Sequence, residues 1–342
     1  MFGRKSWAVF ALAASLVLVV AACGGGSTDG GTSGGEGDAG LTGTIVVSGS
    51  STVQPITSLV AELFAADNPD VAISVDGPGT GDGFALFCNG ETDISDASRP
   101  IKDEEAAVCD ANGVPYVELK IGLDGITVMT NPANGGITCL STADLYALLG
   151  PESQGFASWS DANALVAELG GAGTLPDAPL DVTAPGEESG TYDAFVELAG
   201  FEDFGVGRGL SEDAAAVMRP DYQASADDNV IIQGIEGSET SLGFAGFAFA
   251  ENASGGVKEI EIDGGAGCVA PSIDTIADGS YPLSRSLYIY VNTDKVASND
   301  ALAAFVDFYL SDAGIVATEE AGYVGLPSAD LETSRTAWSS VA

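Results

Sequence analysis

The stretch DVTAPGEESGTYDAF, residues 181–195, leads from a predicted strand through the Gly- and Ser-rich turn ESGT into a predicted helix. At such a turn, free backbone N–H groups and hydroxyl groups converge at the start of a helix. The positive end of the helix dipole lies at the same point, so the turn suits a bound oxyanion. The stretch therefore predicts an α/β fold with an anion site at a helix N-terminus.

The same chemistry recurs three times in the first third of the chain. The loops are GSST at residues 49–52, GTGDG at residues 79–83 and SDASR at residues 95–99. Any one of them, taken alone, is an ordinary connection in which Ser, Thr or Gly caps a helix. Four such loops in one chain favour an oxyanion-binding cleft.

The N-terminus has the pattern of a bacterial lipoprotein signal. Two basic residues precede an apolar run, residues 7–20, which is short for a membrane span, and VAAC ends at Cys23. Small residues before a Cys resemble the lipobox, where that Cys becomes the lipidated first residue. An ordinary signal peptide with a chance Cys is the alternative. We expect residues 1–22 to be a signal peptide and Cys23 to anchor the protein at the extracytoplasmic face of the cell membrane.

Residues 23–43 contain almost no apolar side chains, so we expect a flexible tether between the anchor and the folded body. The whole chain has 50 acidic and 11 basic residues, a formal net charge of −39. This charge argues against nucleic acid as a partner and is typical of a solvated acidic surface. An anionic ligand must then be held by short-range dipoles and hydrogen bonds.

The chain contains no His, which excludes Ser-His and Cys-His catalysis and removes the commonest transition-metal ligand. We expect neither a metal nor a cofactor. Four Cys remain beyond Cys23, and an even number in an exported chain indicates disulfides. Of the three pairings, we expect Cys88 with Cys109, which closes a local segment, and Cys139 with Cys268, which joins distant parts of one domain.

The 342 residues, 45% of them hydrophobic, are enough for two α/β domains. The first elements alternate as βαβα, which favours a parallel sheet with its loops at the carboxyl ends of the strands. Two long β-rich runs, residues 116–132 and 281–292, are predicted to cross between the domains. We expect domain 1 at residues 44–124 and 288–342, and domain 2 at residues 125–287, with a hinged cleft between them.

Seven segments, in order, resemble the substrate-binding lipoprotein of bacterial phosphate ABC transporters: GSSTVQPI, GTGDGF, TDISDASRPI, DGITVMTNP, PGEESGTYDAF, SADDNVIIQGI and YPLSRSLYIYV. The match extends from residue 44 to about residue 327. The resemblance implies a type II periplasmic binding protein that encloses inorganic phosphate between its domains. It also implies a monomer that presents the closed form to a membrane permease and is not an enzyme.

The resemblance places the phosphate ligands in the four loops: Ser51, Thr52 and the backbone of Val53; Thr80; Ser98 and Arg99; Ser189, Gly190 and Thr191. Some members of the family carry an Arg four positions before the equivalent of Ser189, where this chain has Pro185. The same members carry Asp in place of Ser98. Arg99 is then expected to be the compensating cation, with an ordinary surface residue as the alternative.

A receptor that tells protonated phosphate from sulfate needs an acceptor for the ligand proton. The candidates are Asp82, Asp93, Asp96 and Asp193, each of which has a helix cap or a strand end as its alternative role. The sequence assigns none of them. The second crossing run also contains Arg285, Tyr288 and Tyr290, which we expect to belong to the hinge and core and not to the ligand site.

Three classes of function remain open from the sequence. The leading one is a phosphate receptor for an importer, and a receptor for sulfate or molybdate is its nearest alternative. A phosphatase with Ser51 or Ser189 as nucleophile has against it the absence of His, of a GxSxG elbow and of a metal cluster. A structural surface protein would bind no ligand.

Overall fold

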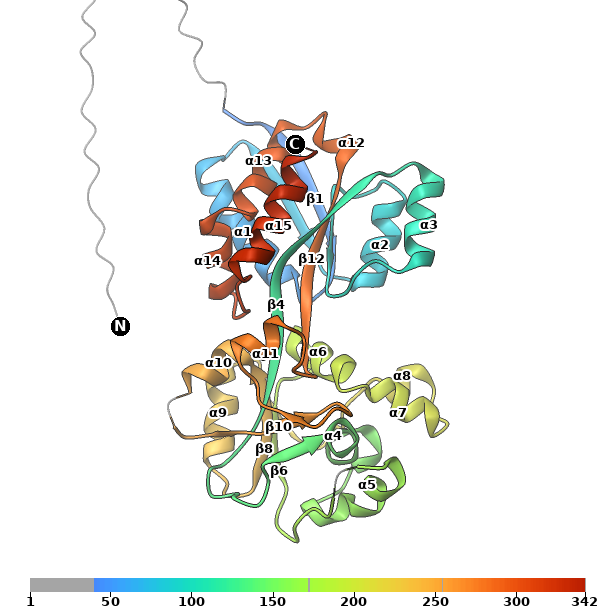
Figure 1. Ribbon diagram of the computed structural model, residues 1–342, viewed down its shortest axis with the longest axis vertical. Helices are drawn as coiled ribbons and strands as arrows, with labels where there is room; N and C mark the ends of the chain where they lie inside the picture. The colour runs from blue at the N-terminus through green and yellow to red at the C-terminus, as the bar shows by residue number, and fades with distance from the viewer. Residues whose placement is uncertain (1–39, 172, 254, 342) are drawn as a thin grey trace, which may run out of the picture. The chain divides into compact units, whose positions relative to one another are not determined.

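The computed structural model describes residues 40–171, 173–253 and 255–341 (Figure 1). The predicted signal peptide, Cys23 and most of the predicted tether lie outside these residues. The chain from Gly40 onward forms one compact unit.

The folded part begins slightly before residue 44. Strand β1 (Gly43–Gly49) starts inside the predicted tether, and Leu41 packs against the hydrophobic core. Residues 41–43 thus belong to the folded part, and the tether before them stays a prediction.

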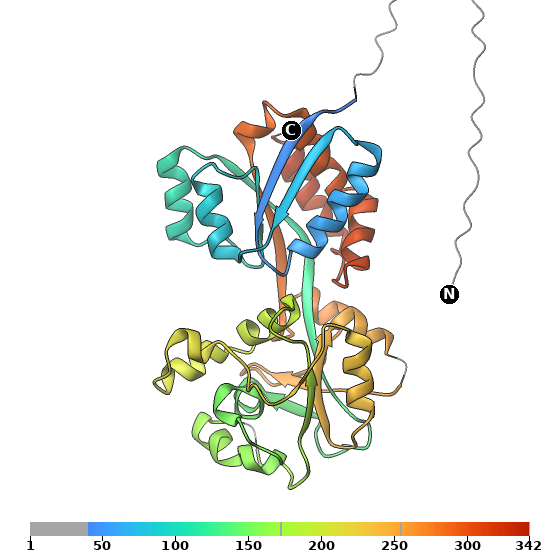
Figure 2. The same cartoon turned by 180° about the vertical axis from the view of Figure 1, so that it is seen from behind.

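Lobe 1 is built on a parallel sheet in the order β2-β1-β3. Its first strands and helices are β1, α1 (Gln54–Asp67), β2 (Val71–Asp76), α2 (Thr80–Cys88), β3 (Ile94–Ala97) and α3 (Asp103–Asn112). Its C-terminal helices are α12 (Thr293–Val296), α13 (Asp300–Tyr309), α14 (Asp312–Glu320) and α15 (Ser328–Ser339). α1 and the C-terminal helices lie on one side of the strands, and α2 and α3 on the other (Figures 1 and 2). The βαβα order is confirmed, and the three loops after the strands meet at one edge of the sheet.

Two long strands, β4 (Tyr116–Thr130) and β12 (Ser284–Asn292), cross between the lobes as predicted (Figure 1). They pair antiparallel with each other, and β12 also pairs antiparallel with β3. The parallel sheet expected from the βαβα order is confirmed for β1, β2 and β3, and the sheet becomes antiparallel where β12 joins it. The difference arises because the returning strand β12 inserts beside β3, which is a long-range pairing that local patterns do not reveal.

Lobe 2 continues the same sheet with β8 (Ser241–Gly246), β6 (Asp181–Ala184) and β7 (Gln223–Ala224) beyond β4, while β9 (Lys258–Glu259) pairs with β4. A small second sheet contains β5 (Cys139–Ser141), β10 (Glu261–Asp263) and β11 (Cys268–Val269).

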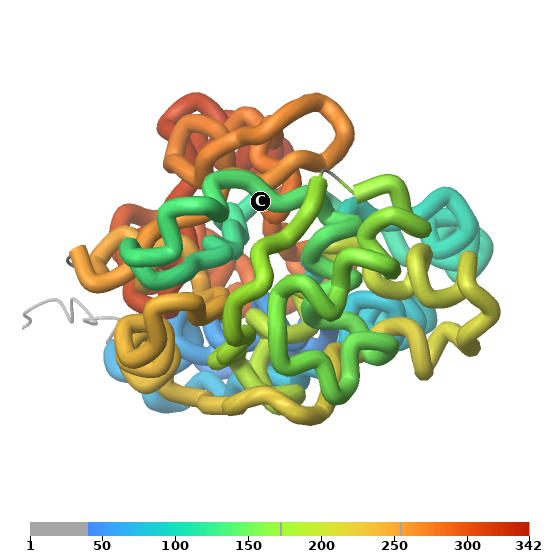
Figure 3. Tube along the Cα trace, turned by 90° about the horizontal axis from the view of Figure 1, so that it is seen from below, coloured from blue at the N-terminus to red at the C-terminus, as the bar shows by residue number. Residues whose placement is uncertain are grey.

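The helices of lobe 2 lie on both sides of these strands. They are α4 (Thr142–Leu149), α5 (Asn163–Leu169), α6 (Gly190–Leu198), α7 (Phe201–Gly207), α8 (Glu212–Ala215), α9 (Asp228–Glu236), α10 (Phe247–Asn252) and α11 (Ile273–Ala277), with short 3-10 turns at Pro151–Ser153 and Trp159–Ala162. α9 and α10 lie on one side, and α4 and α5 on the other (Figures 1 and 3). The predicted strand, turn and helix in residues 181–195 are confirmed: the Gly- and Ser-rich turn connects β6 to α6.

Each lobe has its own hydrophobic core. Ile45, Phe64 and Phe305 belong to the main cluster of lobe 1, and Tyr146 and Phe244 to that of lobe 2. Along β4, the side chains change from the first cluster to the second between residues 121 and 123. The two-domain fold is thus present, while the predicted boundaries at residues 124–125 and 287–288 stay a prediction.

Both predicted disulfides are confirmed. Cys88–Cys109 joins the end of α2 to α3, and Cys139–Cys268 joins β5 to β11 across a sequence separation of 129 residues. The first bridge stabilises the helix pair that carries Thr80 at its start.

No single helix in the described part of the chain is long and apolar enough to cross a membrane. α13 and α14 pass that test only as a pair, and the pair is bent by 65°. Within residues 40–341, apart from 172 and 254, no group of three His, Cys, Asp or Glu side chains is placed to hold a metal ion.

Candidate anion-binding site

Backbone hydrogen bonds join the three loops of lobe 1. The Ser50 N–H donates to the Asp96 carbonyl at 2.9 Å, and the Gly79 N–H donates to the Gly49 carbonyl at 2.9 Å. Gly49 has a φ of 156°, and a Cβ on Gly83 would lie 2.4 Å from the Gly49 Cα. Glycine at position 83 thus allows α2 to approach β1 closely enough for the loops to form one surface.

Thr80 and Ser98 meet at the start of α2, as the sequence predicts. Their hydroxyl oxygens are 3.0 Å apart, and the Ser98 N–H donates to the Thr80 hydroxyl oxygen at 3.2 Å. The N-cap of α2 is Gly79, which supplies no side-chain cap. The first N–H groups of this helix are therefore open to an external acceptor.

The start of α1 differs, because the Val53 and Gln54 N–H groups already donate to the Ser50 carbonyl, at 3.2 and 2.9 Å. Its N-cap is Val53, again without a side-chain cap, and Pro occupies the first turn. The Val53 N–H, which we expected to face the ligand, contacts the Ser50 hydroxyl oxygen at 3.4 Å, and the Thr52 N–H does so at 3.2 Å. Ser50 thus holds this loop in place, and the ligand role of the Val53 backbone stays a prediction.

The loop of residues 189–191 in lobe 2 lies against the loop of residues 49–52 in lobe 1. Ser189 caps α6 by accepting the Thr191 N–H at 3.2 Å, and the Thr52 hydroxyl donates to the Gly190 carbonyl at 3.4 Å. A Cβ on Gly190 would lie 3.2 Å from the Thr52 Cα, so glycine permits this close approach. The structure brings together Ser51, Thr52 and the 189–191 loop, which are separated by more than 130 residues.

Asp193 is the candidate carboxylate that lies at this junction. The Ser51 hydroxyl donates to Asp193 Oδ2 at 3.1 Å. Partial burial raises the pKa of Asp193, although the Ser51 hydrogen bond and the Arg285 charge lower it in part.

The other three Asp candidates lie in different surroundings. Asp82 is exposed on the first turn of α2. Asp93 accepts the Val46 N–H at 2.7 Å and forms an ion pair with Lys295 at 3.0 Å, which is the strand-end role. Asp96 is fully buried, and its charge acts on Tyr309 inside lobe 1.

Arg99 already has a counter-ion in this structure. Its guanidinium forms two hydrogen bonds with Glu105, at 2.7 and 2.8 Å, and lies over the Phe84 ring, 5.6 Å from the centroid. The Glu105 hydrogen bond raises the pKa of Arg99. Glu105 also accepts the Lys102 N–H at the start of α3, so it is fixed by the helix. The role of Arg99 as a ligand stays a prediction.

Arg285 is the cation that the sequence reasoning did not place in the site. It lies on the crossing strand β12, as expected, but its Nη2 also donates to the Thr52 hydroxyl oxygen at 3.0 Å. The same guanidinium pairs with Asp124 at 3.3 Å and with Glu197 at 2.5 Å, and the side chain is only 9% exposed. Arg285 therefore connects the hinge strand to both lobes.

A signal for this pair is present in the sequence. Asp124 is the single charge of residues 121–132 and Arg285 is the single charge of residues 281–292, and the two are Cα partners in the sheet. A charge buried alone is very costly, so two opposite charges in two crossing strands predict a pair. Burial raises the pKa of Asp124, while Arg285 lowers it in part.

A cavity of about 350 Å³ lies beside this junction. Its lining includes Asp124, the 189–191 loop, Asp228 and Tyr323. The start of α6 is thus reached from open space.

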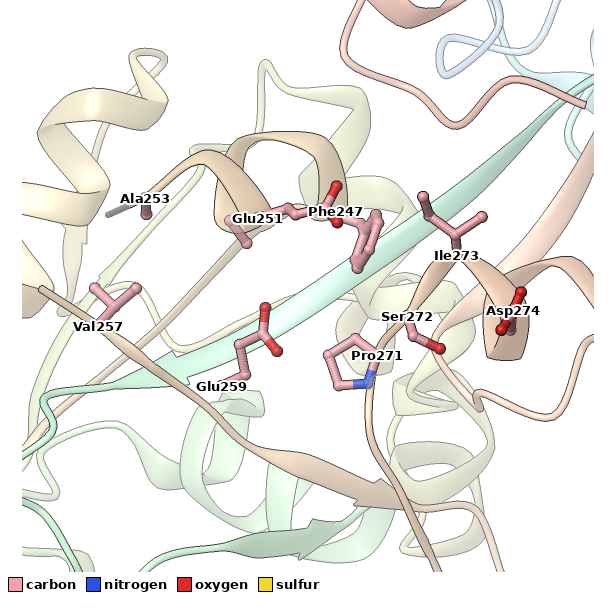
Figure 4. A pocket seen from close by; sticks show the side chains of 10 residues that line it. Phe247, Glu251, Ala253, Val257, Glu259, Pro271, Ser272, Ile273 and Asp274 are labelled. Atoms are coloured by element: carbon pink, nitrogen blue, oxygen red, sulfur yellow. The ribbon is translucent and has the colours of Figure 1, made fainter. Parts of the chain in front are cut away.

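A larger hollow, of about 830 Å³, lies in lobe 2 between α10 and α11 (Figure 4). Glu251, Glu259 and Asp274 are among its lining side chains, and the described lining contains no Lys or Arg. Burial raises the pKa of Glu259, and the Glu251 charge adds to that effect. None of the predicted ligand residues lines this hollow, so we do not assign the oxyanion site to it.

Comparisons with known proteins agree with this architecture. The model of the PBP superfamily domain matches residues 34–313. Protein SphX of Synechocystis sp. is 41% identical over 286 residues, which cover 83% of this chain and 79% of SphX. Phosphate-binding protein PstS of Staphylococcus saprophyticus is 36% identical over 332 residues, which cover 95% of this chain and 92% of PstS.

Solved structures show the same fold. The crystal structure of a possible phosphate binding protein from Planctomyces limnophilus has a TM-score of 0.78 at 37% identity, and the match covers 88% of this chain and 99% of that one. An ABC-type phosphate transport receptor from Vibrio cholerae has a TM-score of 0.59 at 24% identity, covering 83% of this chain and all of that one. The expected type II periplasmic binding protein fold is confirmed, and the chain belongs to the phosphate-binding protein family of the PBP superfamily.

Proposed function

We propose that this protein captures inorganic phosphate between its two lobes and delivers it to the permease of an ABC importer. The single observation that carries the proposal is the meeting of Thr52, the 189–191 loop and Arg285 at one junction. Relatives named as phosphate-binding proteins match along nearly the whole chain.

The ligand is held by donors from both lobes. A dianion taken out of water must recover its hydration through hydrogen bonds, and each bond to a charged group contributes roughly 1.5–3 kcal/mol. Lobe 1 supplies the Ser51, Thr52, Thr80 and Ser98 hydroxyls and the uncapped start of α2. Lobe 2 supplies the start of α6, and the crossing strand supplies Arg285. Because the donors lie on both lobes, phosphate favours the conformation that brings the lobes together.

Asp193 is the acceptor for the ligand proton in this proposal. It accepts the Ser51 hydroxyl at 3.1 Å at the junction of the two lobes, and its pKa is raised above the ordinary value. Protonated phosphate can donate a hydrogen bond to it, whereas fully ionised sulfate can only be repelled.

Calorimetry with phosphate, sulfate and molybdate tests this function. We expect the protein to bind phosphate and to bind sulfate at least about a hundredfold more weakly, a difference of roughly 2.7 kcal/mol. In the Asp193→Asn variant, the difference between the phosphate and sulfate affinities should be smaller than in the parent. Tighter binding of sulfate or molybdate than of phosphate would assign a different oxyanion to the site.

The proposal places the protein at the extracytoplasmic face, as a monomer held by a lipid on Cys23. The VAAC motif and the two disulfides support this placement, because disulfides persist in oxidising compartments. Membrane fractionation of a Cys23→Ala variant tests the anchor. We expect the variant in the soluble fraction, and retention in the membrane fraction would count against lipidation.

A further inference from the structure

The Glu197 carboxylate occupies a position that suits an anion. It lies near the end of α6, the helix whose start carries the 189–191 loop. Its Oε2 accepts a hydrogen bond from Arg285 Nη1 at 2.5 Å, and its charge also acts on Arg99. The positive charges of Arg285 and Arg99 therefore both act on the Glu197 carboxylate.

The partners of Arg285 differ in how easily they can leave. Asp124 is 7% exposed and lies on the strand paired with β12, so it is fixed by the sheet. Glu197 is 57% exposed on a helix surface and can turn into water. Glu197 is thus the displaceable partner, and Asp124 the permanent one.

The charge balance around Arg285 requires that one carboxylate leaves or is neutralised. Asp124, Asp193 and Glu197 carry three formal negative charges against the single positive charge of Arg285, while Arg99 and Glu105 balance each other. An entering anion adds to this excess. Moving Glu197 into water removes one negative charge and frees the Nη1 donor of Arg285, while Asp124 stays paired with the same guanidinium.

We propose that Glu197 is a resident counter-ion that the ligand must displace, and that this competition helps to determine specificity. The inference rests on the proposed function of the cleft. A phosphate dianion forms stronger charge-assisted hydrogen bonds to Arg285 than the glutamate does, so it wins the exchange. A monovalent anion such as nitrate offers no such advantage over a carboxylate that is already in place. Glu197 thereby excludes abundant weak anions from the site.

Calorimetric titration of the protein with inorganic phosphate tests the inference through Glu197→Gln. The substitution keeps the shape of the side chain and removes the competing charge. We expect phosphate to bind about three- to tenfold more tightly, and excess nitrate to weaken phosphate binding more than it does in the parent. Glu197→Asp keeps the charge but shortens the reach to Arg285, so it should tighten binding to a smaller degree.

The matched control is Glu202→Gln. Glu202 is exposed on α7, lines the same surface hollow as Glu197 and forms no ion pair among the described residues. Glu202→Gln changes the net charge by the same amount as Glu197→Gln. We expect its phosphate affinity to lie within about twofold of that of the parent. Unchanged or weaker phosphate binding in Glu197→Gln would overturn the inference, as would an equal gain in the control. A parent that does not bind phosphate would instead contradict the proposed function, and the inference with it.

Discussion

Asp96 is the residue at which burial and charge conflict most strongly. It is fully buried at the carboxyl end of β3, and neither carboxylate oxygen has a hydrogen bond of good geometry among the described residues. Burial raises the pKa of Asp96 to about 7, and the Thr57 hydroxyl lowers it only in part. Its backbone carbonyl accepts the Ser50 N–H, so the backbone of Asp96 is joined directly to the loop of residues 49–52.

The raised pKa of Asp96 predicts that stability falls as the pH rises. Above pH 4 the unfolded chain releases this proton while the folded chain retains it, so stability is lost between about pH 4 and pH 7. The shift from the ordinary value of 3.8 corresponds to on the order of 4 kcal/mol. Asp96→Asn should therefore raise the Tm more at pH 8 than at pH 5.

Thermal unfolding of the parent and of Asp96→Asn at both pH values checks this prediction. The control is Asp82→Asn, an exposed carboxylate on the neighbouring helix, for which we expect little change in Tm. If the Tm of the parent and the Tm of Asp96→Asn changed by the same amount between pH 5 and pH 8, Asp96 would be ionised in the folded protein at both pH values, and the prediction would be wrong.

At the scale of elements, the contact between α2 and β1 sets the position of Thr80. The contact depends on Gly83, whose added Cβ would meet the Gly49 Cα at 2.4 Å and the Ser48 carbonyl at 3.0 Å. Both neighbours are backbone atoms in a buried strand, so α2 itself has to move. The Cys88–Cys109 bridge at the other end of α2 limits that movement to the end that carries Thr80.

Gly83→Ala should weaken phosphate binding at least about tenfold, or 1.4 kcal/mol, because Thr80 moves away from the other loops. Overpacking of this kind also costs roughly 1–3 kcal/mol of stability. Calorimetry and thermal unfolding measure the two effects. Gly207→Ala on α7, where a Cβ meets nothing within 4 Å, is the control. If Gly83→Ala bound phosphate as tightly as the parent, the contact between α2 and β1 would not be needed for phosphate binding.

The sequence predicts elements well where the signal is local. The crossing strands β4 and β12, the βαβα order and the turn before α6 follow from short patterns of apolar residues and Gly, Ser and Thr. The antiparallel place of β12 beside β3 does not, because strand pairing depends on contacts about 190 residues apart. The two disulfides lie between these cases. An even number of Cys residues in an exported chain predicts that disulfides form, but only the fold determines which Cys residues pair.

The site shows the same limit at the level of side chains. The hydroxyls of Thr80 and Ser98 lie together as expected, because both follow parallel strands of one sheet. The sequence predicts a hinge and core role for Arg285, and its contact with Thr52 arises from tertiary packing. The pairing of Arg99 with Glu105 likewise depends on where α3 starts.

For the whole molecule, the central claim is that the junction between the lobes is the phosphate site. Arg285 tests it best, because the residue lies on a crossing strand and touches Thr52 of lobe 1 and Glu197 of lobe 2. Arg335 on α15 offers a matched control, since it pairs with Asp312 and the Leu310 carbonyl within lobe 1.

The most direct measurement is therefore the phosphate affinity of Arg285→Gln beside the parent and Arg335→Gln, by calorimetry at one pH and salt concentration. We expect Arg285→Gln to bind phosphate at least about tenfold more weakly than the parent, a loss of 1.4 kcal/mol or more, because it removes the charged donor at the junction. Arg335→Gln should bind like the parent. Parent-like phosphate affinity in Arg285→Gln, with its fold intact by thermal unfolding, would place the phosphate site elsewhere.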